Sequence, residues 1–176
     1  MTITVRADVR IARPVDVVFE LAAGRTANLA RFFTGHKPLI PGIRSAALVG
    51  RADPPVAGSL RDVALSDGTS IQERVLAFEA PRLHRYDMAR MNLLQRVLCS
   101  NMVSEWRFEP DGEGASRVTW EYAIHERGLG GRLLGPLVAR HFQRAMQSCL
   151  DNVAGRGPGW LTAPAVVVFD HRRGTN

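Results

Sequence analysis

The stretch GSLRDVALSDGTSIQERVLAFEAPRLHRYDM, residues 58–88, decides the fold because it predicts three consecutive antiparallel strands. Two runs of β-favouring residues flank residues 66–68, and a three-residue loop with glycine in the left-handed conformation is a common hairpin connection. This loop pairs Arg61 with Glu73, whereas a two-residue Asp-Gly loop would place Arg61 opposite Arg74. Because like charges directly opposite each other destabilise a sheet, we expect the three-residue loop.

The predicted register puts a charged pair on the same face as branched apolar residues. Side chains alternate between the two faces of a strand. One face should therefore carry Arg61, Val63, Ile71, Glu73, Val75 and Ala77. The pair of Arg61 and Glu73 is then either a polar group inside a pocket or a solvated cross-strand ion pair, and the sequence leaves both interpretations open.

Composition favours one soluble domain in a reducing compartment. The chain has 176 residues, of which 45% are hydrophobic, and this suits a single domain. No apolar run reaches the roughly 18 residues of a membrane span, and the N-terminus alternates in polarity, unlike a signal peptide. Cys99 and Cys149 are too few for a disulfide framework. We therefore expect a cytoplasmic protein without a membrane span.

The formal net charge of +6 is a second constraint on partners. Such a charge would suit an acidic ligand, an anionic surface or nucleic acid. The arginines are scattered along the chain without aromatic residues between clusters, so we expect no specific binding of nucleic acid.

The order of the remaining elements completes the expected fold. Alternation over residues 3–11 predicts a first strand, and two short helices are expected at residues 15–23 and 28–33. Further strands are expected at residues 43–49, 59–65, 69–78, 83–88, 102–108 and 117–124. An apolar stripe at helical spacing predicts one long helix over residues 133–153. This order indicates an α+β domain in which a curved antiparallel sheet of about seven strands wraps around the C-terminal helix. The space between sheet and helix would be the binding site.

Several segments resemble the SRPBCC superfamily of helix-grip proteins. They are ITVRADVRIARPVDVVFELAA, LIPGI, residues 58–88 quoted above, WRFEPDGEGASRVTWEY and GLGGRLLGPLVARHFQRAMQSCLDNV, and the resemblance covers about residues 3–153. It implies a helix-grip ligand-binding domain at residues 1–155, followed by a C-terminal extension at residues 156–176.

The resemblance also implies a function class. The superfamily includes START-like lipid-binding domains, polyketide cyclases and plant hormone-binding proteins, so the expected function is to bind a hydrophobic small molecule, such as a lipid or polyketide. Two alternatives stay open: an enzyme of the polyketide cyclase, dehydrase or aromatase kind that uses polar pocket residues, and a non-enzymatic interaction module. The fold alone does not decide among them.

Candidate site residues follow from the strand faces and the helix stripe. The candidate catalytic residues are Arg61, Glu73, Tyr86 and His141. The candidate ligand-binding residues are Phe32, Tyr86, Met102, Trp106, Phe108, Trp120, Tyr122, Val138, His141 and Phe142. The aromatic residues could equally be ordinary core, Tyr86 could end a strand at the rim, and His141 could border the apolar stripe in contact with water.

Other motifs argue against metal and nucleotide cofactors. Neither HExxH nor paired CxxC occurs, so we expect no metal and no cofactor. Residues 128–131, GLGG, resemble a dinucleotide-binding loop only in part, because Leu133 stands where the third glycine would be. We interpret them as a flexible start of the long helix that could gate a pocket. The apolar run at residues 165–169 should dock on its own domain, pair with a sheet edge, or contact a second copy in a homodimer.

Overall fold

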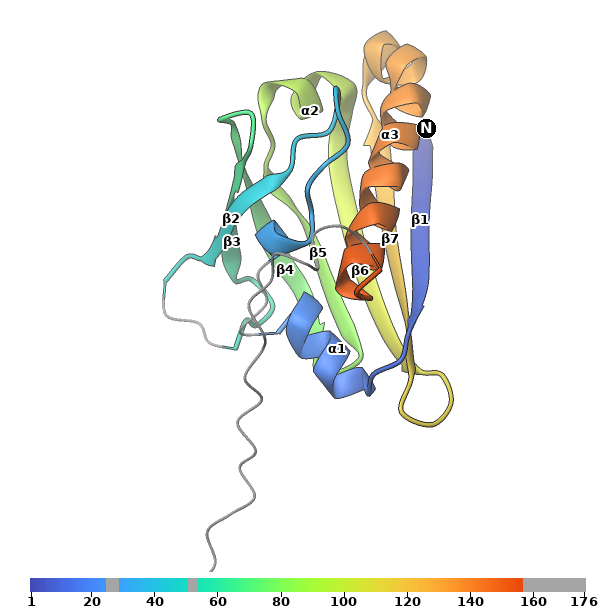
Figure 1. Cartoon of the computed structure of the whole chain (residues 1–176). Helices are drawn as coiled ribbons and strands as arrows, with labels where there is room; N and C mark the ends of the chain where they lie inside the picture. The colour runs from blue at the N-terminus through green and yellow to red at the C-terminus, as the bar shows by residue number, and fades with distance from the viewer. Residues whose placement is uncertain (25–28, 51–53, 157–176) are drawn as a thin grey trace, which may run out of the picture.

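Seven antiparallel strands form one sheet in the order β1-β7-β6-β5-β4-β3-β2 in the computed structural model, which describes residues 1–24, 29–50 and 54–156 (Figure 1). The strands are β1 (Thr2–Ile11), β2 (Ile43–Leu48), β3 (Leu60–Leu65), β4 (Ser70–Glu79), β5 (Leu83–Arg90), β6 (Cys99–Pro110) and β7 (Ser116–Glu126). The helical elements are α1 (Val15–Ala22), the 3-10 turn η1 (Leu29–Arg31), α2 (Leu93–Leu98) and α3 (Gly128–Val153). The α+β helix-grip fold predicted from the sequence is confirmed, including the two short helical elements between β1 and β2.

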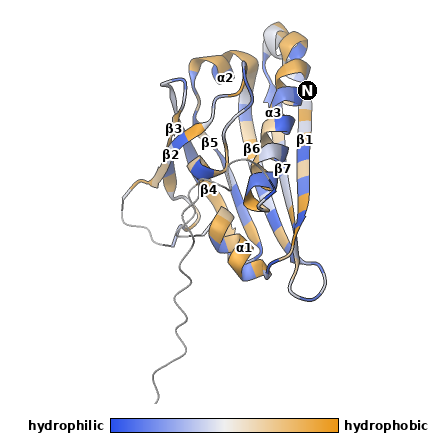
Figure 2. Ribbon diagram, in the orientation of Figure 1, coloured by the Kyte–Doolittle hydropathy of each residue, from blue (hydrophilic) through white to orange (hydrophobic). Residues whose placement is uncertain are grey.

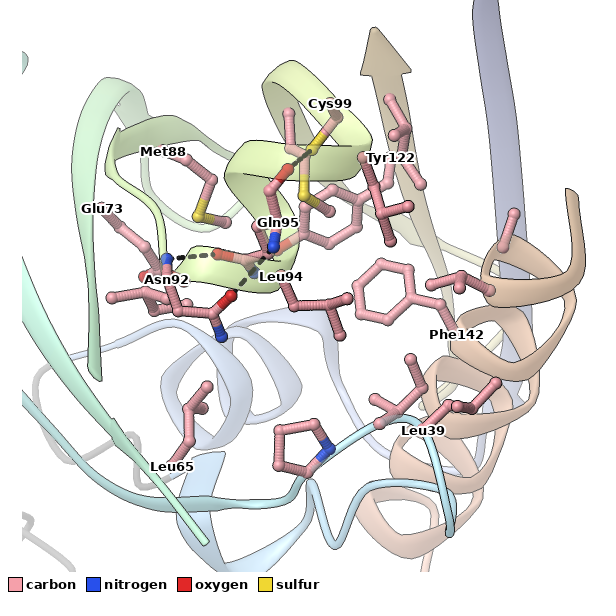
Figure 3. Close-up of a pocket in the computed structure, with 18 of the residues that line it drawn as sticks. Leu39, Leu65, Glu73, Met88, Asn92, Leu94, Gln95, Cys99, Tyr122 and Phe142 are labelled. Atoms are coloured by element: carbon pink, nitrogen blue, oxygen red, sulfur yellow. Dashed lines mark hydrogen bonds between the residues drawn. The ribbon is translucent and has the colours of Figure 1, made fainter. Parts of the chain in front are cut away.

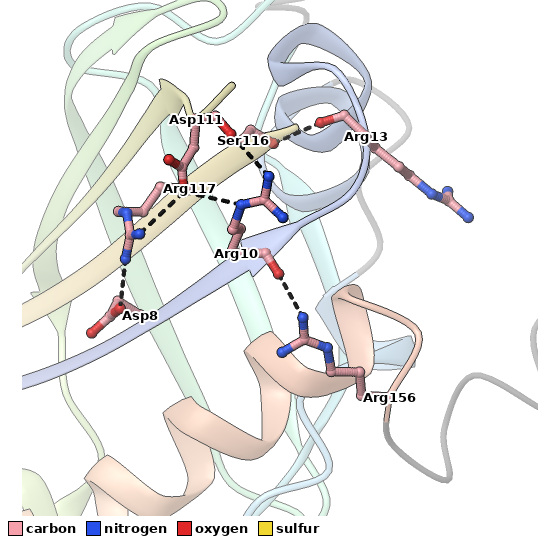
Figure 4. Close-up of polar contacts among 7 residues, drawn as sticks. All are labelled: Asp8, Arg10, Arg13, Asp111, Ser116, Arg117 and Arg156. Carbon is pink, nitrogen blue, oxygen red and sulfur yellow. Dashed lines mark hydrogen bonds and ion pairs between the residues drawn. The ribbon is translucent and has the colours of Figure 1, made fainter. Parts of the chain in front are cut away.

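Helix α3 lies along the inner face of the sheet because one side of it is apolar (Figure 1). Its buried residues include Ala139, Met146, Cys149, Leu150 and Val153. The far end of the helix is also tied to β1 by side chains that donate to backbone oxygens. Gln143 donates to Arg6 O at 2.9 Å. Arg156, just after the helix, donates to Arg10 O at 2.9 Å, as Figure 4 shows. These bonds fix the helix on the edge of the sheet that β1 forms.

Aromatic packing fills the half of the interior that α1 covers. Phe19 of α1 makes edge-to-face contacts with Phe78 and Phe108, with ring centroids 5.3 and 5.0 Å apart. Trp106 stacks on Trp120 at 4.1 Å between β6 and β7. Aromatic side chains therefore pack the interior beneath α1.

The hairpin register expected from residues 58–88 is confirmed. The Leu65 N–H donates to Thr69 O at 2.9 Å, and Gly68 has a φ of 86°, which is the left-handed region that glycine adopts without strain. Arg61 faces Glu73 and Val63 faces Ile71 across the β3–β4 pair.

A β-bulge changes the predicted face at the end of β4. The register with β5 shifts between Val75 and Ala77, and an extra residue in one strand switches which side chains face inward. Phe78 therefore packs inward against Phe19, and the prediction that Ala77 shares the face of Glu73 is wrong.

Two features near α2 also differ from the sequence-based expectation. Helix α2 was not predicted, and its start is fixed by a capping box in which Asn92 and Gln95 satisfy each other's backbone N–H groups. Helix α3 begins at Gly128 instead of near Leu133, so residues 128–131 form its first turn and are not a flexible gate. Gly131 packs so tightly that a Cβ there would lie 2.3 Å from Leu98 O.

Within the described residues, no helix combines the length and the hydrophobicity needed to cross a bilayer. The expected apolar run at residues 165–169 lies outside the described residues, as does all of the C-terminal extension except Arg156.

Candidate ligand pocket

A pocket that opens to solvent lies between the sheet and α3 (Figure 3). The empty space in and around it, including the solvent at its mouth, is about 1070 Å3. Residues 39–41, α2 and α3 surround it on the sides away from the sheet. Its walls are mainly apolar and include Phe33, Leu39, Ile40, Leu65, Met88, Leu94, Met102, Trp120, Val138 and Phe142. A cavity of this kind fits an apolar molecule of small size.

Strand alternation explains the sheet side of the wall. Tyr86, Met102, Trp120 and Tyr122 come from three neighbouring strands and all point to the face that α3 covers. Phe142 closes the opposite side from α3, with its ring 4.8 Å from that of Tyr122.

Glu73 supplies a buried carboxylate to this mainly apolar wall, and Arg61 neutralises it. Glu126 supplies a second carboxylate, whose Oε2 finds no hydrogen-bond partner among the described residues. Glu73 Oε2 accepts from Arg61 Nε at 2.7 Å and lies 2.5 Å from Arg61 Nη2. The two side chains are only 13% and 6% exposed, so the pair points inward and is not a solvated surface pair. Glu73 lines the pocket, while the Arg61 guanidinium lies over the Tyr86 ring at 5.2 Å. Burial would lower the pKa of Arg61, but Glu73 holds that pKa above its usual value.

Two tyrosines form the second polar feature of the wall. Tyr86 Oη and Tyr122 Oη are 3.0 Å apart in a buried hydrogen bond. Burial, with a further contribution from the Glu73 charge, raises the pKa of Tyr86 to about 12. Burial and the neighbouring Tyr86 and Glu73 also raise the pKa of Tyr122 well above its usual value. Both phenols therefore stay protonated near neutral pH, and at least one of them can donate to an oxygen atom in the pocket.

His84 is a buried titratable residue next to this cluster that the sequence did not single out. Its ring lies between those of Phe78 and Tyr86, with centroids 5.4 and 5.2 Å away. Neither ring nitrogen finds a hydrogen-bond partner among the described residues, and the same holds for Trp106 Nε1. Burial, together with the positive charge of Arg61, lowers the pKa of His84 to about 3, so the ring stays neutral.

His141 lies outside the pocket wall, at a junction with the loop after η1. Its Nδ1 is 3.0 Å from Nδ1 of His36, and the two rings meet edge to face at 4.9 Å. A hydrogen bond between these atoms requires one ring to donate and the other to accept. The pair joins α3 to the loop that carries Leu39 and Ile40 into the pocket wall.

The structure brings together most of the candidates named from the sequence. Tyr86, Met102, Trp120, Tyr122, Val138 and Phe142 line the pocket, as does Glu73. Phe32, Trp106 and Phe108 are buried in the core away from it, and His141 lies outside it.

Sequence reasoning missed the contribution of α2 to the wall. Asn92, Leu94 and Gln95 line the pocket, and Figure 3 shows the capping bonds of Asn92 and Gln95 beside it. The spacing of Asn92 and Gln95, three residues apart before an apolar run, is the signal that could have revealed this helix.

No group of three or more metal-ligating side chains occurs within the described part of the chain. The polar side chains that line the pocket are those of Glu73, Tyr86, Asn92, Gln95, Tyr122 and Glu126.

Comparison with known proteins agrees with this architecture. Residues 2–157 match the family described as polyketide cyclase / dehydrase and lipid transport. The chain belongs to this family. Its place in the SRPBCC superfamily, expected from the sequence, is thereby confirmed, and at the level of the family the function is to bind hydrophobic molecules. No curated protein matches the sequence.

Solved structures similar to this family member share its fold at low sequence identity. An aromatase/cyclase from a Streptomyces species has a TM-score of 0.67 at 15% identity, over 88% of this chain and 93% of that one. A norcoclaurine synthase point mutant from Thalictrum flavum, in complex with a transition-state analogue, has a TM-score of 0.65 at 15% identity, over 88% and 93%. A major latex-like protein from Panax ginseng has a TM-score of 0.55 at 17% identity, over 84% and 96%.

Proposed function

We propose that this protein encloses a hydrophobic small molecule whose one polar end reaches Glu73, Tyr86 and Tyr122. The observation that carries the proposal is an apolar pocket whose sheet wall holds a buried carboxylate and two buried phenols. Apolar walls supply most of the binding free energy in such sites, and a few polar groups fix the orientation of the ligand.

The polar groups favour an uncharged ligand that carries hydroxyl or carbonyl oxygens. The Glu73 carboxylate can accept from a hydroxyl group, while a phenol of the Tyr86–Tyr122 pair can donate to a carbonyl. Arg61 already neutralises Glu73, and the described residues that line the pocket include no Lys or Arg to hold a ligand carboxylate. Lipids and polyketides with neutral oxygen functions fit this description, in keeping with the family to which the chain belongs.

Catalysis of the cyclase or dehydrase kind is a second candidate, and the closeness of Glu73 to the two phenols favours it. A carboxylate next to phenol donors can remove a proton from carbon beside a carbonyl, while the phenols stabilise the oxygen that becomes negative. The similar fold of the Streptomyces aromatase/cyclase is compatible with such a reaction. In this role Glu73 would be the base, Tyr86 or Tyr122 would be the donor, and Arg61 would position the carboxylate.

Ligand capture is tested by native mass spectrometry of the purified protein, followed by solvent extraction and identification of released molecules. We expect a bound apolar molecule, or uptake of a fluorescent fatty alcohol. Val138→Phe should abolish uptake because Val138 lines the pocket, whereas Val17→Phe, on the exposed side of α1, should not change it. Repeated absence of any ligand, together with no uptake by the wild-type protein, would refute the proposal.

The two candidate functions separate at Glu73. On an identified ligand that is also turned over, the double variant Glu73→Gln, Arg61→Met, which leaves no buried charge unpaired, should abolish turnover while binding is retained. If turnover survives in this double variant, the catalytic assignment is wrong and the protein is a carrier.

A further inference from the structure

The end of the molecule formed by α2 and the first half of α3 exposes an unusual amount of apolar surface. Twelve large apolar side chains are exposed among the described residues, and more than half of them lie here. We define the leucine patch as Leu93, Leu94, Val97, Leu129, Leu133 and Leu137. Leu93 and Leu133 are 76% and 77% exposed. Contiguous apolar surface of this kind on a folded protein marks an interaction site.

The two helices of the leucine patch form one continuous surface. A Cβ on Gly130 would lie 4.0 Å from Val97 Cγ1, and the Arg127 N–H donates to Leu98 O at 2.9 Å. Figure 2 shows the hydrophobic colour on α2 and on the end of α3 beside it. The side chains of both helices can therefore contact a single partner.

Helix α2 and residues 128–150 of α3, which carry the leucine patch, have basic side chains and no acidic ones. Leu129, Leu133 and Leu137 are spaced by four residues, and Arg140 and Arg144 continue the same outer face of α3. Arg96 and Arg132 are also exposed on the two helices. No Asp or Glu occurs at residues 88–104 or 127–150.

Several arginines elsewhere on the molecule are neutralised by acidic side chains. Arg117 lies 3.5 Å from Asp8 and 3.1 Å from Asp111, and Arg10 lies 3.4 Å from Asp111 (Figure 4). Within the described residues, by contrast, no ion pair involves Arg132, Arg140 or Arg144. The positive charge of the outer face of α3 is therefore available to a partner.

We propose that the leucine patch docks onto the surface of an anionic lipid bilayer. Leucines on one part of a helical surface, with arginines beside them, match a bilayer interface whose acyl region is apolar and whose headgroups are negative. We call the exposed arginines of the two helices, Arg96, Arg132, Arg140 and Arg144, the basic rim. A second copy of the chain fits the patch less well, because a two-fold contact through it would bring the two basic rims together.

Docking in this orientation would place the pocket mouth at the lipid surface. Leu94 belongs to the leucine patch and also lines the pocket, and Val138 lines the pocket one residue beyond Leu137. An apolar ligand could then pass between bilayer and pocket without crossing water. The docking itself does not depend on which molecule the pocket holds.

The test is flotation of the full chain with vesicles of phosphatidylcholine alone or mixed with phosphatidylglycerol. We expect flotation with the anionic vesicles, little with the neutral ones, and weaker flotation at high salt. Leu129→Ser combined with Leu133→Ser should weaken binding about tenfold or more. Arg132→Gln combined with Arg140→Gln should weaken it on the order of tenfold. The matched controls Val56→Ser and Arg6→Gln, exposed elsewhere, should bind as the wild type does.

Two results would overturn the proposal. The first is the absence of flotation with anionic vesicles while the protein is monomeric and folded by circular dichroism. The second is a dimer, seen by light scattering, that dissociates in the Leu129→Ser, Leu133→Ser variant, because the patch would then join two copies. Equal binding to neutral vesicles, unchanged by the arginine substitutions, would refute the role of the basic rim.

Discussion

Replacing His84 by Phe should remove a large acid sensitivity from the fold. His84 is 3% exposed, lies between two aromatic rings and has no hydrogen-bond partner among the described residues. Its pKa falls from the ordinary 6.5 to about 3. Above pH 6.5 the ring is neutral in both the folded and the unfolded chain, so it adds no pH dependence there. Below that pH the unfolded chain binds a proton that the folded chain does not, and stability falls.

The magnitude follows from the size of this shift. Each pH unit within the window from 6.5 to about 3 costs about 1.4 kcal/mol of unfolding free energy. Between pH 6 and pH 4 the wild type should therefore lose about 3 kcal/mol relative to His84→Phe. Phe is apolar and also aromatic, so it keeps the ring contacts and removes two buried nitrogens that lack partners.

The assay is urea unfolding of both proteins at several values between pH 7 and pH 4, followed by circular dichroism. The other titrating groups are common to both proteins, so they cancel in the difference between the two free energies. If the two curves of stability against pH run parallel, His84 is not a desolvated neutral histidine, and the reasoning is wrong.

Three further predictions concern other parts of the interior. Arg61→Met should destabilise the fold by about 3–5 kcal/mol in chemical denaturation, because it leaves the Glu73 carboxylate buried and unpaired. Adding Glu73→Gln should restore most of that loss, and equal losses in the single and the double variant would contradict this. Gly131→Ala should lower the melting temperature because the new Cβ would lie 2.3 Å from Leu98 O. Gly130→Ala, whose new Cβ would have no atom nearer than 4.0 Å, should raise the free energy of unfolding by up to about 1 kcal/mol. Similar effects at both sites would refute the tight contact. Burial raises the pKa of the Cys149 thiol, so Ellman's reagent should label it only after unfolding, and rapid labelling of the native protein would show that α3 opens locally.

Local sequence patterns predicted most of the fold, because residues close in sequence determine turns, strand faces and hairpin register. The loop at residues 66–68 sets the register of Arg61 and Glu73 through glycine conformation and charge, and both are visible in the sequence. Strict alternation of faces cannot reveal a β-bulge. The bulge after Val75 inserts one residue and turns Phe78 inward, and no residue type at this point of the sequence marks it.

The candidate site depended more on tertiary contacts. Strand faces correctly indicated that Tyr86 and Tyr122 share the concave side, but alternation could not say that Trp106 lies deeper than the pocket. The direction of Arg61 depends on which side of the sheet α3 covers, and no short stretch of sequence carries that information. The partner of His141 is His36, more than a hundred positions away, and only the folded chain brings the two together.

The ion pair between Arg61 on β3 and Glu73 on β4 makes the ligand preference of the pocket sensitive to a single substitution. Because Arg61 and Glu73 cancel each other, changing either one alone alters the net charge of the cavity by one unit. With Gln at position 73, the Arg61 guanidinium next to the pocket wall would lose its carboxylate partner, and the carboxylate of a ligand such as a fatty acid could take that place. One nucleotide change in the codon is enough to convert a glutamate into a glutamine, so relatives of nearly identical fold can diverge between neutral and acidic ligands in a single step.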